Sequence, residues 1–207
     1  WLCRVWSGTP LPVRVSVLDD AGLAIDDGTA VQLFRRLTRL DATPFEPSGP
    51  PVATRGGRVD LRLRPPRSAW YAAEARTPVT PVATAALRVV VAARIAVPDD
   101  LGRQRGTRFT IRGRMAFAGS AARGTLSVSR CRFPDPRRCV ADAAFRSPSS
   151  RLAVRRSGPF SLTVALRTAG TNVYRLRYVP RDRAAFVESS RLVAIRLVAG
   201  SARARSR

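Results

Sequence analysis

Two segments about a hundred residues apart repeat the same order of strand signals. Each begins at a glycine, continues as a strand that alternates apolar and polar residues, passes a tyrosine, and ends in an apolar run that begins at an arginine. The first copy comprises Gly57, residues 58–64, Tyr71 and residues 88–95; the second comprises Gly158, residues 159–166, Tyr174 and residues 191–197. The spacing from the glycine to the tyrosine, and from the glycine to the last run, differs by only two residues between the copies. A fixed order of elements at matching offsets predicts two copies of one β domain.

Alternation with a period of two residues recurs along the chain, whereas the spacing of an amphipathic helix is hard to find. In one clear example, Phe160, Leu162 and Val164 alternate with Ser161 and Thr163. Such a strand turns one face to a core and the other to water, as strands of antiparallel sheets do. The 16 prolines and 14 glycines separate these short runs. The pattern therefore favours an all-β fold of two-sheet antiparallel sandwiches over any helical fold.

The expected division of the chain falls near Pro98, where the sequence Pro-Asp-Asp interrupts a long apolar run. We expect a first β-sandwich domain over residues 1–97 and a second over residues 98–200. Residues 201–207 form a basic segment without an apolar pattern. This segment is expected to be a frayed tail, or alternatively a tail that touches an anionic surface.

The charge of the chain is large, positive and carried entirely by arginine. The formal net charge is +23, from 37 arginines and 14 acidic residues, with neither lysine nor histidine. GC-rich codon usage favours arginine over lysine and explains this composition without any partner; selection for an anionic partner is the alternative. Residues 1–97 carry a net charge of +5 and residues 98–207 a net charge of +18. Any electrostatic partner should therefore meet the second half of the chain first.

A selected binding site for nucleic acid, acidic cell-wall polymer or an anionic membrane requires several arginines in one place. The candidate polyanion patch consists of six arginines of the second half: Arg130, Arg132, Arg137, Arg138, Arg155 and Arg156. If the charge reflects codon usage instead, the arginines should be scattered over outward strand faces, each solvated or near a carboxylate. Arg62 and Arg64, Arg112 and Arg114, and Arg175 and Arg177 are the pairs expected to show that scatter.

Two of the three cysteines bracket a short loop. Cys131 and Cys139 enclose seven residues that include Pro134 and Pro136, and the bends at these prolines favour close approach of the two sulfurs. We expect a disulfide, which implies an oxidising compartment; the alternative is a pair of reduced thiols beside a loop. Cys3 is left over, and is either buried or paired with a cysteine upstream of this sequence.

The absence of histidine excludes several classes of catalytic and metal-binding site. Ser-His-Asp and Cys-His nucleophile systems and most transition-metal sites need histidine. Three cysteines without histidine do not complete a zinc site, and no glycine-rich phosphate loop is present. Asp19, Asp20, Asp26 and Asp27 lack the spacing of an EF-hand, so two solvated turns explain them better than a calcium site. We therefore expect no catalytic activity, no cofactor and no bound metal.

Several segments resemble a known family. Residues 13–22, Val-Arg-Val-Ser-Val-Leu-Asp-Asp-Ala-Gly, followed by residues 28–36, are similar to the opening of bacterial Ig-like surface repeats. Residues 107–113 and 173–178 are similar to secreted actinobacterial modules of the Ig and fibronectin III type. The resemblance covers about residues 10–199 and implies two tandem Ig-like antiparallel β-sandwich domains at the cell surface or outside the cell. The cysteine loop and the high arginine content depart from it, and no catalytic residues carry over from it.

Three functions are compatible with these observations. The leading hypothesis is a non-catalytic structural, adhesion or assembly module of an exported bacterial cell-surface protein, which contacts other proteins or cell-envelope components within a larger assembly. The alternative is an arginine-rich protein that binds a polyanion through its second domain. The third is an accessory domain of an enzyme that lies outside this chain. The start at Trp1 indicates a removed signal peptide or upstream region, and no apolar run approaches the roughly 20 residues of a membrane-spanning helix.

Overall fold

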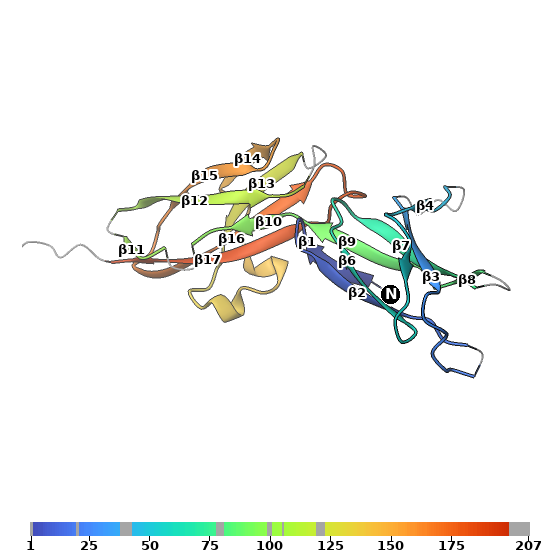
Figure 1. The fold of residues 1–207 in the computed structure, drawn as a ribbon. Coiled ribbons are helices and arrows are strands. Elements are labelled where there is room, and N and C mark those ends of the chain that lie inside the picture. Colours follow the sequence, from blue (N-terminus) through green and yellow to red (C-terminus); the bar gives the residue numbers. More distant parts are fainter. Residues whose placement is uncertain are drawn as a thin grey trace, which may run out of the picture. The chain divides into compact units, whose positions relative to one another are not determined.

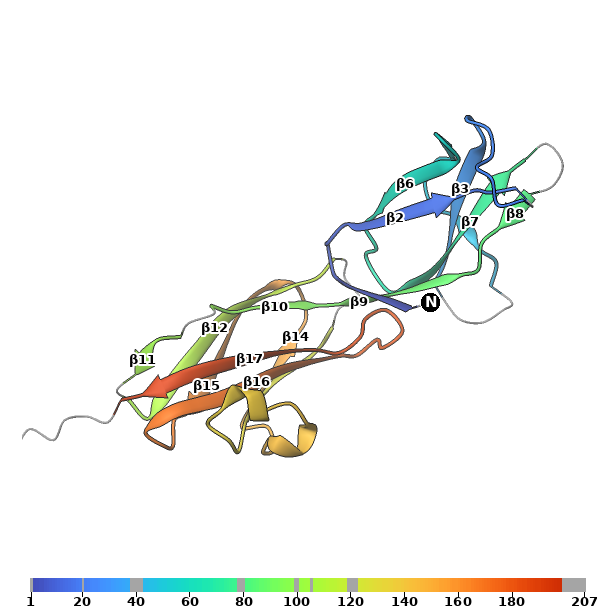
Figure 2. The same cartoon turned by 90° about the horizontal axis from the view of Figure 1, so that it is seen from below.

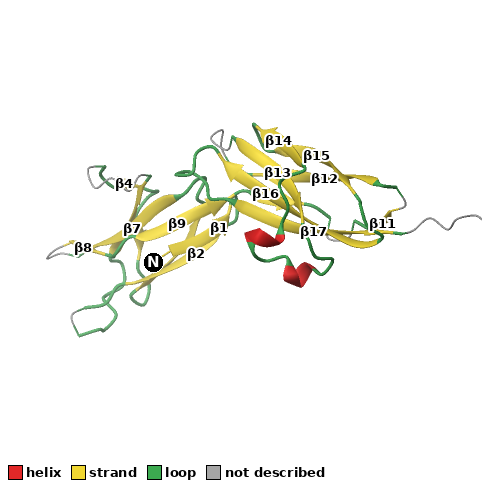
Figure 3. Cartoon of the chain, turned by 180° about the vertical axis from the view of Figure 1, so that it is seen from behind, coloured by secondary structure: helices red, strands yellow, loops and turns green. Residues whose placement is uncertain are grey.

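The computed structural model describes residues 2–19, 21–37, 43–77, 81–98, 101–104, 106–118 and 123–198. Within these residues the regular secondary structure is β-strand except for two short 3-10 helices in the second half (Figures 1 and 3). It divides into two compact units, Trp1–Ala92 with Arg183–Val187, and Ala93–Asp182 with Glu188–Arg207. The predicted all-β sandwich fold is confirmed. None of the helices in the described ranges is long and apolar enough to span a membrane, and the expected basic tail lies outside the described residues.

The first unit is a sandwich of a large and a small sheet. Its strands are β1 Leu2–Trp6, β2 Leu11–Ser16, β3 Ala30–Arg36, β4 Glu46–Pro47, β5 Val52–Ala53, β6 Arg58–Leu63, β7 Ala69–Arg76, β8 Pro81–Ala83 and β9 Leu87–Ala92. The large sheet has the order β1-β9-β7-β3-β4, with β5 on β3 and β8 on β7, and the small sheet pairs β2 with β6. All of these pairs are antiparallel except β1 with β9.

A segment remote in sequence completes the first unit. Arg183–Val187 belongs to this unit although it lies between the last two strands of the second. The Val187 amide donates to the carbonyl of Val91, and the Ser68 amide donates to the carbonyl of Ala185. Phe186 is fully buried. The units are therefore not two uninterrupted halves of the sequence, whereas the sequence analysis expected a single division near Pro98.

The second unit is a sandwich of three and five strands (Figure 2). Its elements are β10 Arg94–Ala96, β11 Arg103–Gln104, β12 Arg108–Ala116, β13 Gly124–Arg130, η1 Pro136–Arg138, η2 Asp142–Ala144, β14 Ser150–Val154, β15 Gly158–Ala165, β16 Gly170–Pro180 and β17 Ser189–Leu197. The three-stranded sheet has the order β10-β12-β15, and the five-stranded sheet has the order β11-β17-β16-β13-β14. Only β11 with β17 is parallel among these pairs.

The two units share one strand order. The series β1-β9-β7-β3 of the first corresponds to β11-β17-β16-β13 of the second, and the pair β2-β6 corresponds to β12-β15. Gly57 directly precedes β6 and Gly158 begins β15, while Tyr71 and Tyr174 lie in β7 and β16. The first closing apolar run covers most of β9 and reaches into β10, and the second lies in β17. Two packed sheets with connections that pass from one sheet to the other are the architecture of immunoglobulin and fibronectin III sandwiches.

The core of the second unit comes from the alternation seen in the sequence. Along β15, Phe160, Leu162 and Val164 are buried while their neighbours are exposed. Each such side chain contributes about 1.5–3 kcal/mol by leaving water. Tyr178 on β16 is fully buried, and its ring stacks on Phe117 with centroids 6.3 Å apart. Burial raises the pKa of Tyr178 to about 12, so its hydroxyl stays protonated throughout the neutral range.

Candidate anion-binding site

The connection from β13 to β14 is a disulfide-closed loop held to the five-stranded sheet. The structure contains the expected disulfide between Cys131 and Cys139, whose Cα atoms lie 6.0 Å apart. The two cysteines pack with Ala144, Phe145 and Val173 in a small buried cluster. A bridge across a loop of this length stabilises by about 2–3 kcal/mol on the loop-entropy relation. Among the described residues, Cys3 is a free and half-buried thiol.

Backbone hydrogen bonds fix both ends of this loop, and with them three arginines. The Cys131 amide donates to the carbonyl of Val173 over 2.8 Å. The Arg132 amide donates to the carbonyl of Ala144 over 2.8 Å, and the Arg146 amide donates to the carbonyl of Arg130 over 2.9 Å. The loop therefore leaves and returns to the sheet at one point, and Arg130, Arg132 and Arg146 lie together there.

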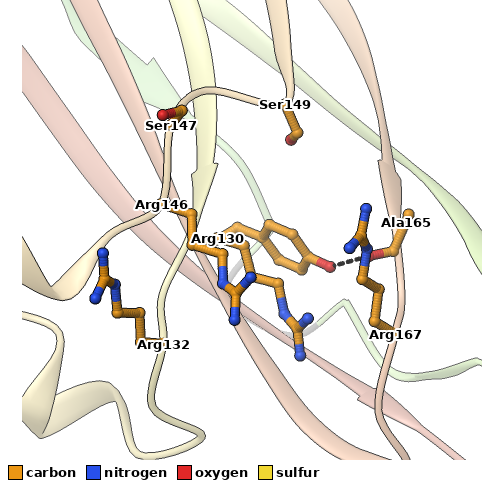
Figure 4. A pocket seen from close by; sticks show the side chains of 8 residues that line it. Arg130, Arg132, Arg146, Ser147, Ser149, Ala165 and Arg167 are labelled. Atoms are coloured by element: carbon orange, nitrogen blue, oxygen red, sulfur yellow. Dashed lines mark hydrogen bonds between the residues drawn. The ribbon is translucent and has the colours of Figure 1, made fainter.

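A fourth arginine joins them from the opposite sheet. Arg167 follows the end of β15, and with the other three it lines a cavity of about 680 Å³ (Figure 4). The remaining lining residues are Ser147, Ser149, Ala165 and Tyr174. We call this cavity the arginine pocket. Among the residues that the structure describes, no acidic side chain lines it.

Tyr174 fixes the wall of the arginine pocket from inside the core. Its side chain is only 1% exposed, and its hydroxyl donates a 2.6 Å hydrogen bond to the carbonyl of Ala165. Burial raises the pKa of Tyr174, an effect that the neighbouring charges of Arg130 and Arg167 partly oppose. The tyrosine is thus a neutral structural group that ties β16 to the end of β15.

The charges of the arginine pocket are not neutralised by the protein. In the described part of the chain, none of Arg132, Arg146 and Arg167 forms an ion pair or a side-chain hydrogen bond. Arg130 donates from Nη2 to the Thr168 hydroxyl over 2.8 Å, and its Nε is buried without a hydrogen-bond partner. A buried donor left without an acceptor carries the cost of its lost hydration. Guanidinium groups stay protonated and present planar sets of donors that match oxyanions, which makes this pocket a candidate anion-binding site.

Two smaller hollows adjoin the arginine pocket and share its arginines. The loop hollow, about 280 Å³, is lined by Arg130 and Arg132 together with residues of the disulfide loop and of the turn before β16. The sheet hollow, about 570 Å³, is lined by Arg146 and Ser147 together with Arg151 and side chains of the five-stranded sheet. The three hollows are thus neighbours on the second unit, linked by the arginines that line two of them.

The sheet hollow differs from the arginine pocket because its arginines have acidic partners. Arg175 donates to Asp142 and stacks on Phe145, with its guanidinium carbon 4.0 Å from the ring centroid. Arg177 donates from Nε to Glu188 over 3.0 Å. The hydrogen bond from Arg175 lowers the pKa of Asp142, and the hydrogen bond to Glu188 raises the pKa of Arg177. Much of the positive charge of the sheet hollow is therefore already balanced.

The structure brings only part of the predicted polyanion patch together. Arg130 and Arg132 line the arginine pocket. Arg137 and Arg138 lie exposed on η1, where Arg138 stacks over Phe133 with 4.2 Å from its guanidinium carbon to the ring centroid. Arg155 and Arg156 lie in the turn after β14. Because β14 pairs with β13 so that Val154 faces Gly124, this turn is at the opposite end of β13 from Arg130.

Arg146 and Arg167 were missed in the sequence analysis. Neither stands in a cluster of arginines, so local charge density gave no signal for them. Arg167 directly follows a core strand, and the hydrogen bond of Tyr174 to that strand was not foreseeable from spacing. The pairs expected to be scattered do lie outside the pocket: Arg62, Arg64, Arg112 and Arg114 are exposed, and Arg175 and Arg177 are ion-paired.

Comparisons with known proteins give only remote structural matches. Neither a family model nor a curated protein matches the sequence. Among solved structures, the fibronectin(III)-like modules of Clostridium thermocellum CbhA match at 9% identity and a TM-score of 0.30, over 99% of this chain and 94% of that chain. The chicken CNTN1 FN1–FN3 domains match at 12% identity and a TM-score of 0.32, over 94% and 63%. Native E. coli alpha-2-macroglobulin matches at 9% identity and a TM-score of 0.33, over 94% of this chain, which spans only 16% of that protein. The assignment to immunoglobulin and fibronectin III sandwiches therefore rests on the strand order of each unit.

Proposed function

We propose that this chain is a non-catalytic adhesion module of an exported bacterial surface protein, and that its second unit attaches to an anionic polymer. The observation that carries the proposal is the arginine pocket, in which four guanidinium groups meet without an acidic partner from the described part of the chain. Like charges gathered in one cavity repel each other, and a bound anion relieves that repulsion. A site whose sole purpose was to stabilise the fold would pair these charges, as Asp142 and Glu188 do in the neighbouring sheet hollow.

The presence of three neighbouring hollows with arginines in their walls supports a polymer rather than a small anion alone. Arg130 and Arg132 line both the loop hollow and the arginine pocket, and Arg146 lines both the arginine pocket and the sheet hollow. A chain of anionic groups would fill these hollows in succession, and each contact would add to the affinity. The net charge of +18 over residues 98–207 favours the approach of such a polymer from a distance.

The disulfide supports export. Disulfides persist in oxidising compartments and are rare in reducing ones. In protein isolated from its native location, we expect peptide mapping without reductant to recover Cys131 and Cys139 as one linked peptide, with Cys3 free within this segment. Recovery of both cysteines as alkylated thiols would contradict the exported role.

The salt dependence of binding tests the polymer half of the proposal. We expect the chain to bind fluorescently labelled polyphosphate, with an affinity that falls about a hundredfold between 50 and 200 mM salt if four phosphate groups are contacted. Fluorescence anisotropy at several salt concentrations gives the slope directly. Absence of binding at 50 mM salt would refute the proposal.

A purely structural role is the second candidate, and one observation favours it. Arg62, Arg112 and Arg114 are exposed on strands, and Arg64 is exposed directly after one, as codon usage alone would place them. If the arginine pocket is also a product of composition, the loss of any two exposed arginines should weaken polyphosphate binding equally. The variants described in the Discussion distinguish the two candidates.

A further inference from the structure

We propose that the arginine pocket is selective for a compact oxyanion group with two negative charges, such as a phosphomonoester, over groups with a single charge. The inference rests on the proposed function, because it names the kind of group that the same site takes from its ligand. It is carried by the number of charges in the pocket, by the free donors around it and by the contrast with the sheet hollow.

The count of charges favours a doubly charged group. Four guanidinium groups line about 680 Å³, and no carboxylate of the described ranges lines it with them. A carboxylate or a phosphodiester brings one negative charge and would leave most of this charge unbalanced. A phosphomonoester brings between one and a half and two charges near neutral pH and offers three strong acceptor oxygens. Several guanidinium groups from different directions can bind those oxygens at the same time.

The free donors of the pocket match those acceptor oxygens. Arg132, Arg146 and Arg167 form no ion pair or side-chain hydrogen bond within the residues that the structure describes, so their guanidinium donors are free to bind ligand oxygens. The Ser147 hydroxyl is exposed and has no hydrogen-bond partner within the residues that the structure describes. Ser149 and Tyr174 already donate to the carbonyls of Val128 and Ala165, so they shape the pocket and are not donors to a ligand.

The adjoining sheet hollow provides an internal contrast. Two of its arginines are balanced by Asp142 and Glu188, which leaves Arg146 and Arg151 as its unpaired cations among the described residues. Singly charged groups are sufficient for that surface. The most densely charged group of a ligand, for example a terminal phosphate, therefore belongs in the arginine pocket.

The pH dependence of two small probes tests this selectivity in the full chain. Phenyl phosphate gains its second charge between pH 5 and pH 8, because the second pKa of a phosphomonoester is near 6, whereas dimethyl phosphate keeps one charge over this range. Arginine does not titrate there. We expect phenyl phosphate to bind at least about fivefold more tightly at pH 8 than at pH 5, the change expected for one added charge about 4 Å from a guanidinium under water-like screening. Dimethyl phosphate should bind weakly, with the same affinity at pH 5 and at pH 8.

Matched variants locate the effect and keep the inference separate from the proposed function. Arg167→Gln should weaken phenyl phosphate binding and reduce its gain in affinity between pH 5 and pH 8, while Arg151→Gln, the same change in the sheet hollow, should leave both nearly unchanged. Isothermal titration calorimetry measures the affinities, and circular dichroism checks that each variant is folded. Equal binding of the two probes, or an Arg151→Gln effect as large as that of Arg167→Gln, would overturn the selectivity while polyphosphate binding still supported the proposed function. Loss of polyphosphate binding as well would overturn both.

Discussion

Replacing Arg130 and Arg146 together with glutamine is expected to weaken polyphosphate binding by at least about a hundredfold. Each substitution removes a charge-assisted contact worth about 1.5–3 kcal/mol. The loss of two phosphate contacts should also reduce the slope of log affinity against log salt concentration by about two. Both arginines line the arginine pocket, and each also lines one of the adjoining hollows. Anisotropy titrations at 50 to 200 mM salt measure both quantities.

The matched control for this variant is Arg155→Gln with Arg156→Gln. It removes the same charge from the same unit, but at the turn after β14, away from the arginine pocket. We expect less than about a tenfold loss from this control, as for a change in diffuse charge screened over about 10 Å. If the two double variants weaken binding equally, the arginines act only through net charge and the purely structural role is correct.

Replacing Tyr174 with alanine is expected to lower the free energy of unfolding of the second unit by about 3–5 kcal/mol. The ring is almost completely buried, and truncation of a buried aromatic side chain removes its burial and leaves a cavity. Tyr174→Phe keeps the ring and removes only the hydrogen bond to Ala165, so it should cost about 1 kcal/mol. Urea denaturation followed by circular dichroism measures both losses.

The two tyrosine variants also test how the arginine pocket is built. The hydroxyl ties β16 to the end of β15, next to the position of Arg167. Tyr174→Phe should therefore reduce phosphate affinity modestly while leaving the fold intact. If neither variant lowers the free energy of unfolding, the assignment of Tyr174 to the core is wrong. If Tyr174→Phe leaves the phosphate affinity unchanged, the hydroxyl of Tyr174 does not help to shape the pocket.

The local patterns of the sequence were sufficient for the class of fold. Alternation along residues 158–166 appears in the structure as the alternating burial of β15, because successive side chains of a strand point to opposite faces. The two tyrosines at equivalent places in the repeat are both buried, at 5% for Tyr71 and 1% for Tyr174. The short spacing between Cys131 and Cys139 also pointed correctly to their bridge. Each of these features depends on neighbours within a few residues or on an internal copy.

The tertiary structure alone decided which charges meet. Arg130 and Arg167 are 37 positions apart and lie at the ends of strands in different sheets, yet they line one cavity. Arg130 and Arg155 are closer in sequence, but the register of β13 with β14 places them at opposite ends of the sheet. The sequence also gave no indication that Arg183–Val187 packs with the first unit. Alternation tells which face of a strand is buried, but strand order and register determine which strand ends become neighbours, and these are set by packing between residues distant in the chain.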